Sequence, residues 1–328
     1  MLPANADITI AAVNNRKYGP TGLPVITGPI TIQGNGAKIV RSNKRLIRRF
    51  RLMAVSNTGE LTLQNVTLSG GSSDEGGGIL NHGTLFIQNS TIAGNSARFY
   101  GGGAASNYGT LSIENSTVSG NQAISGGGVF NLGSGSVRIA NSVVSGNEAS
   151  SAAGAVGNLS SGSVTIENST ISDNSADSAG GGIFNFNSYA SVSIEDSVIS
   201  GNHAVWAGGG IFNHGTVNVA DSMISDNSAS RGGGAFNSSS YFSPNTLSIT
   251  NSTISGNEAS DDGGGIFNYR SGCYYSCYFG GYLSLVDSTI TQNQAGDSGG
   301  GVFNEGSLNM TNSTISNNQA PNGPDIFP

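Results

Sequence analysis

The chain has 328 residues, of which 51 are glycine and only 10% are charged, and its formal net charge is −7. This composition argues against long amphipathic helices, and no apolar stretch approaches the ~20 residues that cross a bilayer. Abundant glycine without a collagen period, together with many Asn, Ser and Thr residues, is typical of short strands joined by tight turns.

Charge is distributed unevenly along the chain. Residues 1–58 hold nine of the 13 Lys and Arg beside a single acid, Asp7, whereas residues 59–328 hold four bases and nineteen acids. The basic run from Lys38 to Arg51 is therefore either a solvated end cap or a patch for an anionic partner. Nothing else in the sequence favours nucleic acid, so we expect no nucleic-acid binding.

Residues 1–58 fit the later repeat poorly, and we interpret them as a basic N-terminal cap with the first irregular coils. Residues 8–10, 25–27 and 30–33 alternate apolar and polar side chains, as half-buried strands do. A solenoid needs such a cap, because its first coil would otherwise expose an open sheet edge.

Residues 59–328 form one continuous body in which a unit of about 25 residues recurs. Each copy contains three predicted strands, with the patterns Val-x-Ile, Ser-Thr-Ile-Ser and Gly-Gly-Ile-Phe-Asn. All copies have the same polarity, so stacking places each strand beside its own equivalent and predicts a parallel solenoid. The copies are registered at Leu61, Leu85, Leu111, Val137, Val164, Val192, Val217, Leu247, Leu283 and Leu308.

Two columns of asparagine recur in the copies. The first lies between the first two strands, where Asn tolerates left-handed backbone angles, and the second ends the second strand. Stacked amides can also hydrogen-bond along the axis, so we interpret both columns as structural; glycosylation of the Asn-Ser-Thr sequences is the alternative. Asp replaces Asn in three copies, but the spacing is not that of a calcium-binding repeat, and we expect no metal and no cofactor.

Paired motifs in the copies resemble a known family of repeats. Residues 254–266 read Ile-Ser-Gly-Asn-x-Ala and then Gly-Gly-Gly-Ile, and eight of nine copies carry Gly-Gly-Gly before the apolar residue. This is similar to polymorphic outer-membrane-protein repeats, in which Phe-x-x-Asn precedes Gly-Gly-Ala-Ile, although an aliphatic residue replaces that Phe here. The resemblance implies an all-β, single-stranded right-handed parallel β-helix, of about ten coils with three strands each, on a secreted or surface protein.

Three long loops after the third strand interrupt the repeat, and insertions in solenoids often carry binding sites. Their aromatic residues would share one corner and could line a shallow groove for sugar rings or a protein partner. The alternative is that the loops bury their own rings. The candidate binding residues are Tyr189, Tyr241, Phe242, Tyr274, Tyr275, Tyr278 and Phe279.

Cys273 and Cys277 lie within the longest of these loops. Their spacing suits a local disulfide, which is typical of an oxidising, extracellular location, with free thiols as the alternative. Two cysteines alone make a poor zinc site.

Candidate catalytic groups are sparse. Arg231 with Asp261 and Asp262 in the next copy is the one grouping of acids near a positive charge, and solvated surface acids are the alternative interpretation. His82 and His214 both occur in Asn-His-Gly sequences, which favours a role in turns.

Two further rows allow alternatives. Outward threonines of the second strand could order water, as in an ice-binding solenoid, although Val143, Val198 and Met223 interrupt the row. The phenylalanines of the third strand would form an exposed stripe if the preceding Ile points inward. We expect them instead to belong to the core.

We therefore predict a non-enzymatic, adhesin-like binding or spacer module of the cell surface or exterior, whose partner is a polysaccharide or a surface protein. The alternative is a polysaccharide lyase or glycoside hydrolase, because the pectate-lyase-like architecture carries such enzymes. We expect a signal peptide and an anchor to lie outside this sequence, and the oligomeric state is left open.

Overall fold

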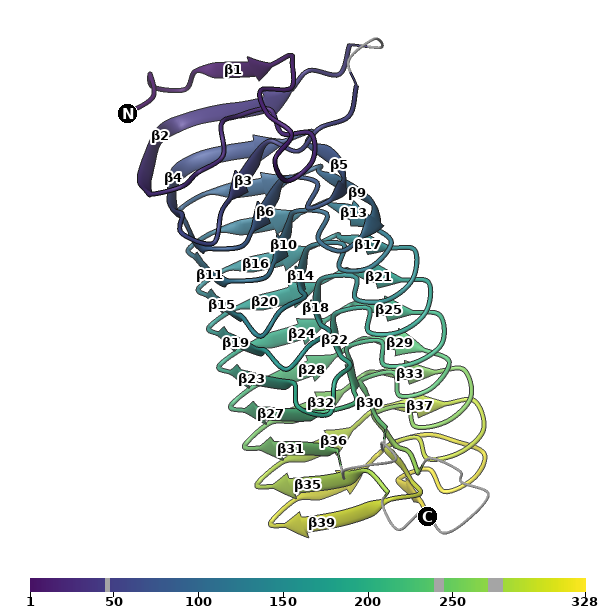
Figure 1. Ribbon diagram of the computed structural model, residues 1–328. Helices are drawn as coiled ribbons and strands as arrows, with labels where there is room; N and C mark the ends of the chain where they lie inside the picture. The colour runs from purple at the N-terminus through teal and green to yellow at the C-terminus, as the bar shows by residue number, and fades with distance from the viewer. Residues whose placement is uncertain (45–47, 239–244, 271–279) are drawn as a thin grey trace.

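The computed structural model describes residues 1–44, 48–238, 245–270 and 280–328, and it forms an elongated parallel β-solenoid (Figure 1). Within these residues, three sheets run along the rod: a first sheet of 21 strands, a second of nine very short strands and a third of 11 strands. The predicted fold class is confirmed, and the 11 strands of the third sheet count the turns of the solenoid.

One turn in the middle of the rod shows how the sequence builds a coil. β23 (Ser191–Glu195) and β24 (Val198–Ser200) both belong to the first sheet, β25 (His203–Ala204) to the second and β26 (Ile211–Asn213) to the third. The three predicted strands are therefore present. The two-residue β25 was not predicted, because two residues are too short to show a period.

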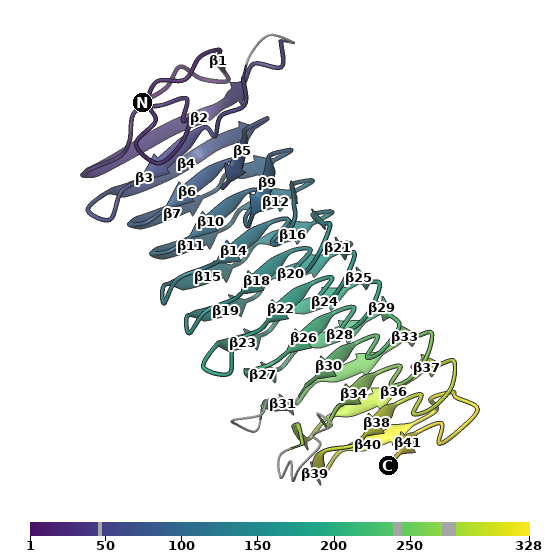
Figure 2. The ribbon, with the colours of Figure 1, turned by 45° about the vertical axis from the view of Figure 1, so that its right-hand side comes forward.

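Each strand pairs with its equivalent in the next turn, parallel and in register. β23 pairs with β27 (Thr216–Ala220), β24 with β28 (Met223–Ser225), and β26 with β30 (Ala235–Asn237). Successive third-sheet strands consequently lie one beneath another along the rod (Figure 2). Backbone groups of an inner turn thus find partners in the turns above and below.

The first corner of each turn, between the two strands of the first sheet, is set by one residue with a left-handed backbone. This position is exposed and holds Asn or Asp with φ near +50°, a conformation that these two residues adopt more readily than other non-glycine residues. The column comprises Asn65, Asn89, Asn115, Asn141, Asn168, Asp196, Asp221, Asn251, Asp287 and Asn312. The predicted backbone role is confirmed.

The second corner, which follows the second strand, is held by a buried row of asparagine side chains. The Nδ2 of Asn202 donates to Oδ1 of Asn227 at 2.9 Å and to the carbonyl of Ile171 at 2.9 Å. The same amide contact links Asn95, Asn121, Asn147, Asn174, Asn202, Asn227, Asn257, Asn293 and Asn318. Axial stacking of amides is thereby confirmed for this column.

A third asparagine row, not predicted as a ladder, ends the strands of the third sheet. Asn185 Nδ2 donates to Asn213 Oδ1 at 3.0 Å, and Asn213 Nδ2 donates to Asn237 Oδ1 at 2.9 Å. All three side chains are buried. Every buried amide in such a row needs a partner, because an unpaired one would cost about 1–3 kcal/mol.

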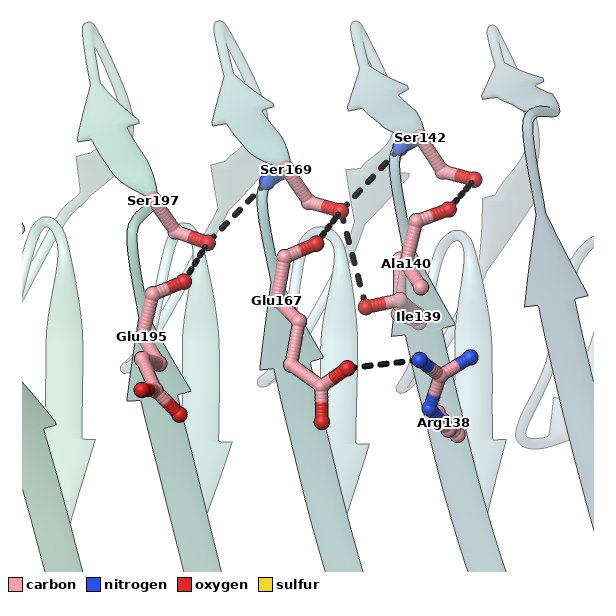
Figure 3. Close-up of polar contacts among 8 residues, drawn as sticks. All are labelled: Arg138, Ile139, Ala140, Ser142, Glu167, Ser169, Glu195 and Ser197. Carbon is pink, nitrogen blue, oxygen red and sulfur yellow. Dashed lines mark hydrogen bonds and ion pairs between the residues drawn. The ribbon is translucent and has the colours of Figure 1, made fainter.

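Serines next to the first corner form a fourth axial row, shown in Figure 3. The backbone N–H of Ser142 donates to Oγ of Ser169 at 3.1 Å, and Ser169 repeats the contact with Ser197 at 3.0 Å. Each hydroxyl donates in turn to the carbonyl two residues earlier, as Ser169 does to Glu167 at 2.7 Å. The serine of the Asn-Ser-Thr sequences is therefore a structural residue.

The core fills the inside of the coil with inward Leu, Ile and Val side chains from the first and third sheets. Ile183, Ile211 and Val192 are each at most 1% exposed. In each turn the first strand contributes two such side chains, and the second and third strands contribute one each, which is the source of the repeat's apolar period.

The phenylalanine column is buried, as expected, but it lies on the opposite face of the third sheet from the core. Phe184, Phe212, Phe236 and Phe267 stack at ring-centroid distances of 5.1, 5.4 and 5.1 Å and are 2–8% exposed. Alanines such as Ala179 and Ala207, which precede the glycine triplets, pack against the rings. The stripe predicted for an inward Ile is thus present, but the chain that leads into each strand covers it.

One turn departs from both the glycine and the phenylalanine patterns. Ala153 takes the place of the first glycine of the triplet and keeps its left-handed backbone, with φ of +66°. Gly157 replaces the phenylalanine, and a Cβ on Gly157 would lie 2.3 Å from Cδ2 of Phe130. Phe130 therefore occupies the space that the missing ring would have filled.

The N-terminal cap joins the body without a break in the first sheet. β1 (Asp7–Ile10) pairs with β2 (Pro29–Arg41), and β2 pairs with β4 (Glu60–Ser69) (Figure 1). At the other end, β39 (Ser307–Thr311), β40 (Thr314–Ser316) and β41 (Ile326–Phe327) are the last strands of the first and third sheets.

Candidate functional site

Among the described residues, a group of contacting aromatic side chains lies over the third sheet, and we call it the aromatic face. It consists of Phe184, Phe186, Trp206, Phe212 and His214, which are linked by ring contacts. β22 (Ile183–Asn185) and β26 supply the two buried phenylalanines, whereas the other three rings come from the chain on either side of these strands.

The geometry is that of a buried aromatic floor with exposed rings at its edges. Phe184 and Phe212 stack at 5.1 Å and are 8% and 4% exposed. Phe186 stacks on Phe184 at 5.3 Å, Trp206 lies 5.9 Å from Phe212, and both edge rings are 47% exposed. Rings held by packing on one side lose little further freedom when a ligand covers the other side.

The loop beside the aromatic face is held in shape by its own backbone. Asn187 Oδ1 accepts from the N–H of Tyr189 at 2.9 Å, and the Asn187 carbonyl accepts from the N–H of Ala190 at 2.8 Å. This local turn leaves the Tyr189 side chain 84% exposed. Tyr189 thus projects from the same loop as Phe186.

His214 is the ionisable member of the aromatic face. Its ring lies 5.5 Å from Phe186, and burial lowers the pKa of its imidazole. The neutral imidazole, with one donor and one acceptor, is therefore favoured at neutral pH.

His82 occupies the same place in an Asn-His-Gly sequence nearer the cap. It stacks between Tyr18 and Tyr108 at 5.0 and 4.8 Å, and burial lowers its pKa. The Tyr108 hydroxyl donates to Glu75 at 2.5 Å, which accompanies burial in raising the pKa of Tyr108. The position after the third-row asparagine thus accepts rings both near the cap and in the middle of the rod.

Among the predicted binding residues, Tyr189 is exposed at the corner where it was expected. Tyr241, Phe242, Tyr274, Tyr275, Tyr278 and Phe279 lie outside the described residues, as do Cys273 and Cys277. The groove shared by the three loops and the disulfide therefore remain predictions.

The charges of Arg231 and Asp261 both act on Asp262, although no ion pair within 4.0 Å joins the three among the described residues, and a catalytic role for this group stays a prediction. The Arg231 guanidinium lies 5.9 Å from the centre of the Phe267 ring, and Asp261 accepts from the Ser230 hydroxyl at 2.7 Å. In the described residues, the one ion pair within 4.0 Å is Arg138–Glu167 on the first sheet, at 2.6 Å (Figure 3).

Asp262 is nevertheless the one carboxyl in the described residues with a resolved pKa shift. Burial raises its pKa, the charge of Asp297 in the next turn raises it further, and Arg231 opposes both effects. Asp297, the acidic neighbour, was not among the candidate catalytic residues named from the sequence. Two carboxyls in adjacent turns can share a proton more readily than isolated ones.

The outer surface of the second strands carries the predicted threonine row and its interruptions. Val143 and Met223 are 40% and 43% exposed, so the row has apolar gaps. A hollow of about 390 Å³ beside Met223 is lined by Asp196, Asp221 and Asn251 at the first corner. Ice binding by this surface stays a prediction.

Sequence patterns did not identify the aromatic face as one site, because its members come from different turns and from both ends of the third-sheet strands. Phe186 and His214 follow third-row asparagines one turn apart, whereas Trp206 precedes a glycine triplet. The available signal was weak: Trp206 is the single tryptophan of the chain and falls in a loop facing the phenylalanine column.

The sequence model of right-handed β-helix regions matches residues 52–229, which is more than half of the chain. Neither the curated proteins nor the solved structures contain a significant match. In the described parts of the chain there is no helix with the length and apolar character that a membrane crossing requires.

Proposed function

We propose that this chain, which belongs to the right-handed β-helix family, is a binding and spacer rod of the cell surface or exterior that binds glycans through the aromatic face. The observation that carries the proposal is the unbroken series of ring contacts from Trp206 through Phe212 and Phe184 to Phe186 and His214. Exposed rings fixed in place from behind suit the flat apolar faces of sugar rings.

The surroundings of the aromatic face support a polar, ring-bearing ligand. Asn187 and Ser188 adjoin Phe186, and His214 supplies a neutral hydrogen-bonding group at its edge. Tyr189, with its hydroxyl free to reach a ligand, extends this edge outward. A few polar groups around an apolar platform are typical of small-molecule and sugar sites.

The proposed location draws on the repeat motifs. Their resemblance to polymorphic outer-membrane-protein repeats favours a secreted or surface protein, and the Asn, Ser and Thr of the rod make its exterior polar. A protein partner is the alternative for the same surface, because exposed aromatic side chains are also enriched at protein interfaces.

A glycan array probed with the full chain and with Trp206→Ala tests the proposal. Phe99→Ala is a matched control, because Phe99 is 52% exposed and lies on β9 (Ser96–Tyr100), four turns nearer the cap. We expect Trp206→Ala to weaken glycan binding roughly 10-fold or more, as loss of a buried aromatic contact does, and Phe99→Ala to leave it unchanged. The absence of any glycan signal, or equal losses in both variants, would contradict the proposal.

A polysaccharide-cleaving enzyme is the second candidate, and the raised pKa of Asp262 beside Asp297 favours it. A carboxyl whose pKa is raised by a neighbouring carboxyl can act as a general acid while the neighbour acts as base. Incubation with acidic and neutral polysaccharides, followed by a reducing-end assay, distinguishes the two functions. Turnover that is abolished by Asp262→Asn and by Asp297→Asn would establish the enzyme.

A further inference from the structure

The cap and the body of the rod differ in charge. Residues 1–58 form the cap at the purple end of Figure 1 and hold nine bases and one acid, whereas the body holds nineteen acids and four bases. A rod with one basic end and an acidic shaft has a strong electrostatic asymmetry along its axis.

Two of the cap's cations are explained by its internal structure. Arg51 is 2% exposed and donates to the Glu75 carbonyl at 2.8 Å, while burial lowers its pKa to about 10. Arg41 donates to the Gly70 carbonyl at 2.6 Å and lies over the Phe50 ring at 5.7 Å. These two residues fasten the cap to the first turns of the body.

Six other cap cations are exposed, and among the described residues only Lys17, which lies over the Tyr18 ring at 5.5 Å, has a side-chain contact of this kind. They are Arg16, Lys17, Lys38, Lys44, Arg48 and Arg49. Within the residues that the structure describes, none of the six forms an ion pair. The one acid of the cap, Asp7, neighbours Lys38 across the β1–β2 pairing.

The six cations come from three separate stretches of chain that meet at one end. Arg16 and Lys17 follow β1, Lys38 lies on β2, and the other three follow β2. The charge of Arg49 lowers the pKa of Arg41, second to burial, so these two cations of the cap lie close enough to repel each other. On the body, by contrast, Arg138 is paired with Glu167.

We propose that the cap is an electrostatic docking surface for an anionic lipid bilayer, on which the rod stands with its acidic body directed away. Basic residues near an anionic leaflet are attracted to it, and the attraction falls off within a Debye length of about 8 Å at physiological salt. The acidic turns beyond the cap lie outside this range or are repelled, and both effects favour an end-on orientation.

A bilayer fits these observations better than a nucleic-acid duplex does. A plane is met by the end of a rod alone, so the acidic sides stay clear of it. A duplex lying along the rod would have to approach Glu114, Glu167 and Glu195, which line the outer surface of the first sheet. The end-on position would hold the aromatic face, several turns from the cap, clear of the bilayer.

Co-sedimentation of the full chain with phospholipid vesicles tests the proposal. We expect binding to phosphatidylcholine vesicles that contain about one-third phosphatidylserine, little binding to pure phosphatidylcholine, and loss of binding at high salt. Binding that does not depend on the anionic lipid would overturn the proposal.

Two double variants with the same change in net charge separate a cap site from overall charge. Arg48→Ser/Arg49→Ser removes two cap cations, and Arg98→Ser/Arg138→Ser removes two from the body. We expect the cap variant to bind anionic vesicles roughly 10-fold or more weakly and the body variant to bind no more weakly than the wild type. Equal losses would overturn the proposal, as would tighter binding of a duplex DNA fragment than of the vesicles.

Thermal unfolding of both variants controls for folding, since all four arginines are on the surface and should leave the melting temperature nearly unchanged. Glycan binding by the cap variant is a further readout. Because Arg48 and Arg49 are remote from the aromatic face, retained glycan binding with lost vesicle binding would confirm that the two sites are independent.

Discussion

Asparagine has different structural roles at the first and second corners of each turn. At the first corner it is exposed and has a left-handed backbone, and Asp takes its place in Asp196, Asp221 and Asp287. At the second corner the side chain is buried, and each described turn from Asn95 to Asn318 has Asn and none has Asp. The same residue type is selected for its main chain in one place and for its amide in the other.

Hydrogen bonding explains why only one of the two corners accepts Asp. In the second corner, Asn202 donates through Nδ2 to the Ile171 carbonyl and to Asn227 Oδ1, while its own Oδ1 accepts from the backbone N–H and the Nδ2 of Asn174. A carboxylate has acceptors only, so it would leave carbonyls unpaired and bury a charge. In the first corner the side chains are exposed, and Asn251 donates through Nδ2 to Oδ1 of Asp221.

The most severe way to break the second corner is Asn202→Asp. We expect it to destabilise the rod by about 3–5 kcal/mol, because it buries an unpaired charge and removes a donor. Asn168→Asp at the first corner is the matched control, and its effect should stay within about 0.5 kcal/mol. The urea midpoint measured by circular dichroism compares the two, and equal midpoints would refute the distinction.

A smaller effect is expected from removing the left-handed preference at the first corner. Asn168→Ala should destabilise by about 1 kcal/mol, because an alanine Cβ is strained at φ near +46°. Asn168→Gly relieves that strain and should recover most of the loss. If alanine and glycine gave the same stability, the corner would depend on the Asn side chain after all.

The last link of the second-corner row offers a still smaller test. Asp325 Oδ1 accepts from the N–H and the Nδ2 of Asn318, at 3.1 and 3.0 Å. This final position needs an acceptor only, so Asp325→Asn should be neutral, while Asp325→Ala should cost about 1 kcal/mol. Hydrogen exchange of the Asn318 amide reports the loss locally, and an unchanged rate in the alanine variant would contradict the assignment.

The smallest effect concerns pH. Buried asparagines do not titrate, so between neutral and mildly acidic pH we expect the histidines to dominate. Burial lowers the pKa of His82 and His214 in the folded state, and their stabilisation is therefore present above the unfolded value of about 6.5 and is lost as the pH falls below it. Replacing both with Gln should flatten the dependence of the melting temperature on pH over this window.

Much of this architecture follows from the sequence, because each turn repeats the same pattern of residues. The left-handed corner was predictable from Asn and Asp alone, and the stacking at the second corner from their period. The third asparagine row was missed because it belongs to a strand, where Asn has no special backbone role. The phenylalanine column was correctly expected to be buried, but it was expected in the core inside the coil, because no alternation pattern could show that a second layer covers the outer face of the third sheet.

The aromatic face could be predicted only in part. The loop with Phe186 and Tyr189 stands out as an insertion into the repeat, whereas Trp206 is brought beside Phe212 by the path of the chain between the second and third sheets. Which rings remain half-exposed depends on which neighbouring side chains pack over each of them. Those contacts cannot be inferred from the spacing of residues in the sequence.

The hydrogen bonds of the second-corner asparagine row all have the same direction along the rod. The Nδ2 of Asn121 donates to Oδ1 of Asn147, and the Nδ2 of Asn147 donates to Oδ1 of Asn174. In each case the donor lies in the earlier turn and the acceptor in the turn that follows it in the chain. When the chain folds from its N-terminus, the earlier turn therefore has an Asn Nδ2 without an acceptor in the row, and the next turn supplies the Oδ1 that accepts from it. Folding can therefore add one turn at a time from the cap. The row ends at Asp325, which accepts from Asn318 and whose carboxylate has no hydrogen to donate.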